Sequence, residues 1–189
     1  VTVVLTHEDA LRKPNSVGVE VRVVDDSMND VPVGEVGEIV YRGPTVMKGY
    51  YKNPEATAEA FQGGWFHSGD LVRMDEEGFV YVVDRKKDMI ISGGENIYPV
   101  EIEEVLYTHP GILEAAVIGI PDETWGEAVM AVVVPKPGVQ LTEEVVIAHC
   151  TQKLASYKKP RKVKFVEALP RNAAGKVLKR VLRETYRTG

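Results

Sequence analysis

Hydrophobic and polar residues alternate along the first part of the chain with the two-residue period of half-buried β-strands. The alternation predicts strands at 1–5, 17–23, 38–41, 71–74 and 79–83. A turn cluster at 25–32 separates two of them, and the acidic, glycine-ended segment 75–78 has the composition of a hairpin turn. This part of the chain therefore reads as a β domain.

One short helix is predicted within this β-rich part. Asn53 is a suitable N-cap, Pro54 suits the first helical position, and the pair Gly63 and Gly64 ends the pattern. The helix is therefore expected to run to Phe61.

Beyond the charged segment 84–88 the pattern changes to helices that alternate with strands. Helices are predicted at 99–108 and 142–154, and strands at 115–120, 128–134 and 162–166. A last helix is indicated by a buried stripe of Leu178, Val181, Leu182 and Thr185. The whole chain thus predicts the α+β class: a β domain over 1–84, a charged hinge at 85–88 and a small α+β domain over 89–189.

Composition and charge narrow the class of protein. A chain of 189 residues with 44% hydrophobic and 27% charged residues can bury a core, which excludes general disorder. Its net charge of -5 argues against a nucleic-acid surface, and no apolar run approaches the ~18 residues that cross a bilayer. We expect a cytosolic protein whose membrane contact is at most peripheral.

The ends of the chain and its single cysteine add two expectations. Cys150 has no partner for an internal disulfide, and no Cys/His cluster indicates a structural metal site. The sequence opens at Val1 without an initiator Met or a leader, which is typical of a piece of a larger protein.

Asp70 is the first candidate for chemistry. The segment 65–70 is expected to end a loop and begin a strand, which would leave this carboxylate at an edge where both its oxygens could accept from ribose hydroxyls. A plain Ser-Gly-Asp turn is the alternative. His67 and Trp65 fit packing better than catalysis, since His67 has no acidic partner nearby in the sequence.

The charged run 84–88 is the second candidate. Most such runs are solvated turns, but a polar link between unlike halves can also rotate without exposing apolar surface. Arg85 could in addition hold a nucleotide hydroxyl or phosphate.

Two glycine-containing segments complete the candidates. Ser92, Gly93 and Gly94 are expected between a strand and a helix, where a backbone without side chains could line a narrow channel; an ordinary turn is the alternative. Lys176 follows Gly175 just before the last helix, where its cation and the helix N-terminus would together favour an anion. A solvated surface lysine is the alternative there.

Taken in order, these segments resemble the C-terminal part of adenylate-forming enzymes, the AMP-dependent synthetases and ligases. The resemblance rests on the stretches 37–43, 64–70, 84–90, 92–103 and 169–176 and covers nearly the whole chain. The residues of these motifs are most similar to those of medium- and long-chain fatty-acyl-CoA synthetases. Aryl-CoA ligases and carrier-protein-loading adenylation domains are the alternatives. A stand-alone interaction module would not need these side chains in this order.

The resemblance implies that residues 1–84 are the end of a larger N-terminal region, with a β-barrel-like subdomain, and that a mobile C-terminal domain with a short antiparallel sheet flanked by helices follows. A fatty acid and ATP would give an acyl-adenylate, from which CoA displaces AMP. Asp70 and Arg85 would hold the nucleotide, Lys176 would be catalytic in adenylation, and Lys87 would be the hinge. Ser92, Gly93 and Gly94 would line the pantetheine channel of CoA.

Other implied parts lie outside this chain or act on it. The phosphate loop, the Mg²⁺ ligands and the acyl pocket would belong to a missing N-terminal domain, so the fragment alone is expected to be inactive. The pattern from Pro170 to Lys176 also resembles a site that a protein acetyltransferase modifies. Acetylation would remove the charge of Lys176.

Overall fold

The computed structural model describes residues 20–187, which form two compact units. Unit 1 ends at Lys86 and unit 2 begins at Lys87. This division falls inside the charged segment for which a hinge is predicted. The strand predicted at 1–5 and the first residues of the strand predicted at 17–23 lie outside the described residues.

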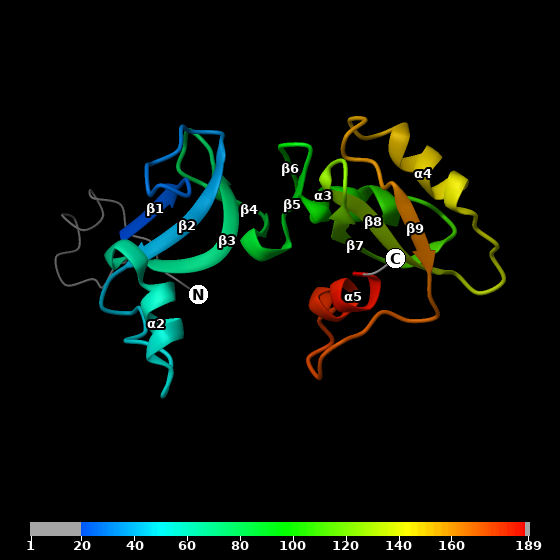
Figure 1. Cartoon of the computed structure of the whole chain (residues 1–189). Coiled ribbons are helices and arrows are strands. Elements are labelled where there is room, and N and C mark those ends of the chain that lie inside the picture. Colours follow the sequence, from blue (N-terminus) through cyan, green and yellow to red (C-terminus); the bar gives the residue numbers. More distant parts are fainter. Residues whose placement is uncertain (1–19, 188–189) are drawn as a thin grey trace. The chain divides into compact units, whose positions relative to one another are not determined.

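Unit 1 is built on an antiparallel sheet of four strands in the order β1-β2-β3-β4 (Figure 1). The strands are β1 (Glu20–Val24), β2 (Val36–Arg42), β3 (Phe66–Met74) and β4 (Val80–Arg85). Over residues 20–86 this sheet is open and not closed into a barrel, as befits the expected remnant of a barrel-like subdomain. The hairpin turn predicted at 75–78 joins β3 to β4, with Met74 paired to Val80.

The predicted helix of unit 1 is confirmed as α2 (Pro54–Ala60), followed by the short 3₁₀ turn η1 (Gln62–Gly64). Asn53 caps α2 by accepting a hydrogen bond from the backbone N–H of Ala56 at 3.0 Å. Gly63 and Gly64 both have positive φ, of 67° and 77°, and end the helical stretch.

Unit 2 is a five-stranded sheet whose main path runs β6-β5-β8-β7. The strands are β5 (Ile90–Ser92), β6 (Glu95–Ile97), β7 (Ile112–Asp122), β8 (Gly126–Pro135) and β9 (Lys162–Phe165). The helices are α3 (Pro99–Tyr107), α4 (Glu143–Thr151) and α5 (Lys179–Tyr186), and the 3₁₀ turn η2 (Lys86–Asp88) precedes β5. The predicted helices and the strands β7, β8 and β9 are therefore present.

The sheet of unit 2 differs from the expectation in two ways. It is not wholly antiparallel, because β9 pairs with β8 in parallel. A strand was expected ahead of the glycines and is present as β5, but the strand β6 that pairs with it was not predicted. β6 is three residues long, too short for a two-residue alternation to be recognised.

Both faces of the unit 2 sheet are buried. Alternate residues of β7 and β8 face opposite clusters, so that Val117 packs with Ile102 of α3 and Val146 of α4 while Ile118 packs with Leu182 of α5. Figure 1 shows α4 and α5 on opposite sides of these strands. The continuous apolar runs of β7 and β8 follow from this burial on two faces.

Candidate functional site

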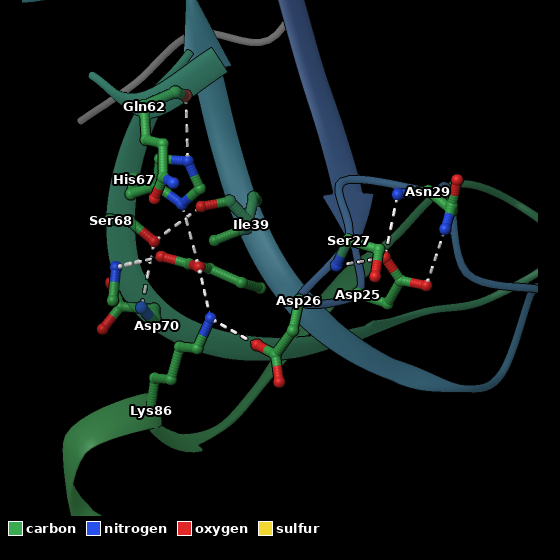
Figure 2. Close-up of polar contacts among 12 residues, drawn as sticks. Asp25, Asp26, Ser27, Asn29, Ile39, Gln62, His67, Ser68, Asp70 and Lys86 are labelled. Atoms are coloured by element: carbon green, nitrogen blue, oxygen red, sulfur yellow. Dashed lines mark hydrogen bonds and ion pairs between the residues drawn. The ribbon is translucent and has the colours of Figure 1, made fainter. Parts of the chain in front are cut away.

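Asp70 lies inside β3 rather than at its start, which corrects the expected loop-to-strand boundary. Gly69, with a φ of +71°, breaks the regular strand, and the pairing with β4 shifts register just beyond Asp70. The Ser68 hydroxyl accepts from the Asp70 backbone N–H at 3.0 Å and donates to the Ile39 carbonyl at 2.7 Å (Figure 2). The backbone thus fixes the direction in which Asp70 projects.

The structure brings Asp70 and Arg85 together. They are cross-strand partners on β3 and β4, and Arg85 Nε lies 2.7 Å from Asp70 Oδ1. The side chains of Asp70 and Arg85 are 30% and 45% exposed, so a carboxylate on β3 and a guanidinium on β4, the edge strand of the described sheet, keep unused hydrogen-bonding capacity.

A buried carboxylate lies beside this pair and has no counterpart among the predicted site residues. Glu38 is 4% exposed and accepts from Lys86 Nζ at 3.1 Å and from the Gly69 N–H at 3.0 Å. Burial alone would raise the pKa of Glu38, but its hydrogen bonds to His67, Lys86 and Gly69 hold that pKa below the usual value. The charged form is therefore stabilised inside unit 1.

His67 contacts Glu38, a partner that the sequence did not reveal. Its Nδ1 lies 3.0 Å from Glu38 Oε2, a partner 29 residues earlier in the chain, and its Nε2 lies 3.1 Å from the Gln62 carbonyl oxygen. Both ring nitrogens face oxygen acceptors, so whichever nitrogen carries a proton can donate it to Glu38 or to Gln62. Local sequence could not reveal a partner that only strand pairing places there.

Ser92, Gly93 and Gly94 form a tight turn between β5 and β6, not the strand-to-helix connection that was expected. Gly93 and Gly94 have φ values of 61° and 85°, as a two-residue hairpin turn with both φ angles positive requires. A Cβ on Gly94 would meet nothing within 4 Å. The backbone of this turn is thus open to close approach by a ligand.

Trp125 and Arg161 lie against this turn and were not predicted as site residues. The Gly93 N–H donates to the Trp125 carbonyl at 2.9 Å, and a Cβ on Gly93 would lie 2.6 Å from Trp125 Cε3. The Arg161 guanidinium stacks on the Trp125 ring, 4.4 Å from the ring centre. The turn therefore has an aromatic and cationic wall.

Lys176 lies in a tight loop ahead of α5, not in the first turn of the helix. Asn172 organises the loop, because its Oδ1 accepts from the N–H groups of Ala174 and Lys176 at 3.0 and 2.9 Å. Gly175 adopts a φ of +81°, and the Lys176 side chain is exposed. Within residues 20–187 no hydrogen bond or ion pair engages Lys176 Nζ or joins this loop to the glycine turn.

Metal ligands are not gathered in the described part of the chain: residues 20–187 contain no cluster of three or more His, Cys, Asp or Glu side chains suited to an ion. No helix in that range is both long and apolar enough to cross a membrane. Cys150 is buried, and this burial raises the pKa of its thiol to about 11.

Two family models match the sequence. The AMP-binding enzyme model matches residues 2–51, and the AMP-binding enzyme C-terminal domain model matches residues 101–176. The chain belongs to the adenylate-forming superfamily of AMP-binding enzymes.

Similar proteins within the adenylate-forming superfamily include a feruloyl-CoA synthase from an Amycolatopsis species, 49% identical over 97% of this chain. The long-chain-fatty-acid–CoA ligase FadD13 of Mycobacterium tuberculosis is 48% identical over 96% of the chain. This chain spans 38% and 37% of the length of these two relatives.

The fold agrees with that of a solved member of the superfamily. The ATP-bound crystal structure of MatB from Rhodopseudomonas palustris superposes with a TM-score of 0.85 at 46% identity, over 90% of this chain and 34% of that one. The α+β class is thereby confirmed. The roles of the individual site residues stay predictions.

Proposed function

We propose that this chain is the C-terminal part of an AMP-forming acid–thiol ligase. In the first step a carboxylate oxygen attacks the α-phosphorus of ATP, the bond to the bridging oxygen breaks, and pyrophosphate leaves. In the second step the thiol of CoA loses its proton and attacks the acyl carbon, which releases AMP and forms a thioester. The longer relatives support a preceding domain that supplies the acyl pocket and the Mg²⁺ ligands.

The observation that carries the proposal is the cross-strand pair of Asp70 and Arg85. One oxygen of Asp70 is engaged by Arg85, and the carboxylate keeps further lone pairs for the two ribose hydroxyls of the nucleotide. Arg85 retains its terminal N–H groups for a ribose or phosphate oxygen. The pair is half-exposed and held by strand pairing, which is suitable for a ligand that must enter and leave.

Lys176 supplies positive charge in the adenylation step. Its exposed ammonium group has no partner in residues 20–187, while its loop is fixed from the backbone by Asn172. A cation so presented stabilises the charge that develops between carboxylate and α-phosphate as pyrophosphate leaves. Because this role depends on charge, acetylation of Lys176 by a protein acetyltransferase would silence the first step.

The turn at Ser92, Gly93 and Gly94 serves the second step. The open space at Gly94 suits the narrow pantetheine arm of CoA, and the wall formed by Trp125 and Arg161 offers a cation beside a phosphate-bearing ligand. Lys176 and the glycine turn belong to different parts of unit 2. We therefore assign Lys176 to adenylation and the turn to thioester formation. Rotation of unit 2 about Lys87 would exchange them.

Two substrate classes are supported by relatives of nearly equal similarity. The long-chain-fatty-acid–CoA ligase FadD13 supports a fatty acid as the substrate of this protein, and the feruloyl-CoA synthase supports an aromatic carboxylate. The residues that would choose between them belong to the acyl pocket, which this proposal places in the preceding domain.

The experiment that tests the function uses the full-length enzyme with ATP, Mg²⁺, CoA and separate panels of fatty and aromatic acids. The expected result is AMP and acyl-CoA in equal amounts, which mass spectrometry of the products would measure. Release of ADP instead of AMP would contradict an adenylate-forming reaction. AMP formation without a CoA thioester, together with transfer of the acyl group to an added acyl carrier protein, would favour the carrier-loading alternative.

A further inference from the structure

Ion pairs flank Lys87 on both sides, two made by Lys86 within unit 1 and one made by Asp88 within unit 2. On the side of unit 1, Lys86 Nζ lies 3.1 Å from Glu38 Oε2 and 2.7 Å from Asp26 Oδ1. On the side of unit 2, Arg183 Nη2 donates to Asp88 Oδ1 at 2.6 Å. Lys87 between them is exposed, and no ion pair or hydrogen bond of its side chain occurs within residues 20–187. One residue with a free side chain thus separates two that are tied down.

The ion pair of Lys86 with Glu38 in unit 1 is difficult to break because Glu38 is buried. Its side chain is 5% exposed, and Lys86 is one of three donors that it uses, with His67 and the Gly69 N–H. Figure 2 shows the Lys86 ammonium reaching toward Asp26 on the opposite side. Withdrawing Lys86 would leave a buried carboxylate short of a donor, which is costly.

The ion pair in unit 2 is fixed through a packed helix. Asp88 is 13% exposed, and its partner Arg183 lies on α5 next to Leu182, which is buried against the sheet. Two residues after Asp88, Ile90 is 1% exposed in the opposite cluster of the same sheet. The chain is therefore immobilised in unit 2 from Asp88 onward.

We propose that Lys86 and Asp88 are positioning residues that confine rotation between the units to the short backbone link between their own Cα atoms, which is centred on Lys87. A change in φ of Lys86 or in ψ of Asp88 would pull a paired side chain from its partner, whereas rotation about the backbone bonds between these two Cα atoms, including both bonds of Lys87, moves neither side chain. A single pivot gives few defined orientations, and several pivots would give many. The inference rests on the proposed function only for its place in the two-step reaction.

A distance measurement on the 189-residue chain tests this. Spin labels on Glu59→Cys of α2 and Glu144→Cys of α4 report the distance between the units, because both positions are exposed. Cys150 is buried and its thiol has a raised pKa, so the label reacts with the introduced thiols. Pulsed electron–electron double resonance then gives the width of the distribution of distances between the two labels.

Removing either flanking ion pair should widen this distribution. We expect Lys86→Met and Asp88→Asn each to broaden it roughly twofold, because a second pivot becomes free. Lys86→Arg keeps the cation and should retain the original width. The matched control is Arg180→Met, which breaks an exposed ion pair on α5 with Glu184 and should change nothing.

The result that would overturn the proposal is a width for Lys86→Met and Asp88→Asn equal to that of the Arg180→Met control. The fluorescence of Trp65 in unit 1 and Trp125 in unit 2 first verifies that each variant is folded. The measurement needs no turnover. A full-length enzyme without ligase activity would therefore refute the proposed function and leave the distance result standing.

Discussion

Unit 2 covers its sheet on both faces, with α3 and α4 over one and α5 over the other, and its two clusters contain most of the fully buried side chains. Unit 1 has two small clusters instead and relies on the buried charge network of Glu38, while strand β4 exposes Val80, Tyr81 and Val82. Unit 2 thus resembles an independent domain, whereas unit 1, over the described residues 20–86, combines a thin core with an edge strand that pairs on one side only. Stability in unit 2 should thus depend on packing, and in unit 1 on charge.

The largest effect is expected from truncation of the unit 2 core. Ile102 is fully buried on α3, and Ile102→Ala should lower the free energy of unfolding of unit 2 by about 2–5 kcal/mol. The matched change Ile39→Ala, in a small cluster of unit 1, should cost less because its neighbours can relax into the space.

Urea unfolding monitored by tryptophan fluorescence measures both stability losses. Trp65 reports on unit 1 in variants without Trp125, and Trp125 reports on unit 2 in variants without Trp65. A shift of both unfolding transitions by Ile102→Ala would show that the units unfold together, which contradicts independent cores in the two units.

The second effect concerns the charge of Glu38. Glu38→Gln removes a buried anion that faces Lys86 and His67, and should lower the free energy of unfolding of unit 1 by about 1–3 kcal/mol. Because the pKa of Glu38 is lowered in the folded state, its stabilisation is complete above the ordinary value of 4.5 and is lost as the pH falls through the folded pKa.

Urea unfolding of unit 1 at a series of acidic pH values measures the effect, and Glu38→Gln should flatten the profile. Glu55→Gln, an exposed change on α2, is the control and should leave it unaltered. An equally steep profile in Glu38→Gln would assign the acid sensitivity to other carboxylates.

A smaller effect separates the two glycines of the β5–β6 turn. Both have positive φ, so an alanine at either position should cost about 1–2 kcal/mol of unit 2 stability from backbone strain. Gly93→Ala should cost more than Gly94→Ala, because only the Cβ at Gly93 meets the Trp125 ring. Unfolding followed through Trp125 compares them, and equal losses would mean that the ring moves aside freely.

The smallest effect is a pH dependence of unit 2. Burial and the nearby His149 and Lys153 lower the pKa of His109, whose Nδ1 accepts from the Gly111 N–H. Protonation therefore favours the unfolded chain, and unit 2 should lose some stability as the pH falls below the ordinary histidine value of 6.5. His109→Gln should reduce this slope in thermal melts, and an unchanged slope would exclude His109 as its source.

Much of the fold was predictable because its signals are local. The cap at Asn53, the turn at 75–78 and the long apolar runs of β7 and β8 each needed only neighbouring residues. The three-residue strand β6 was missed because it is too short to show an alternation, and the parallel pairing of β9 was missed because it depends on residues far away in the sequence.

The candidate site divides in the same way. Asp70 and Arg85 were selected as separate residues, and only the β3–β4 register makes them a pair. The partner of His67 and the Trp125 wall beside Gly93 required tertiary contacts across 29 and 32 residues, which no local pattern encodes. Asn172 could have been found, since an asparagine ahead of a glycine-containing turn often organises it.

In the proposed function, Lys176 and the glycine turn serve different steps of one reaction. The most direct measurement compares the two half-reactions in the full-length enzyme, with Lys176→Ala and Gly94→Leu as the paired variants. Lys176→Ala should abolish ATP–pyrophosphate exchange and spare thioester formation from supplied acyl-adenylate, while Gly94→Leu should do the reverse. Equal loss of both half-reactions in either variant would contradict the account.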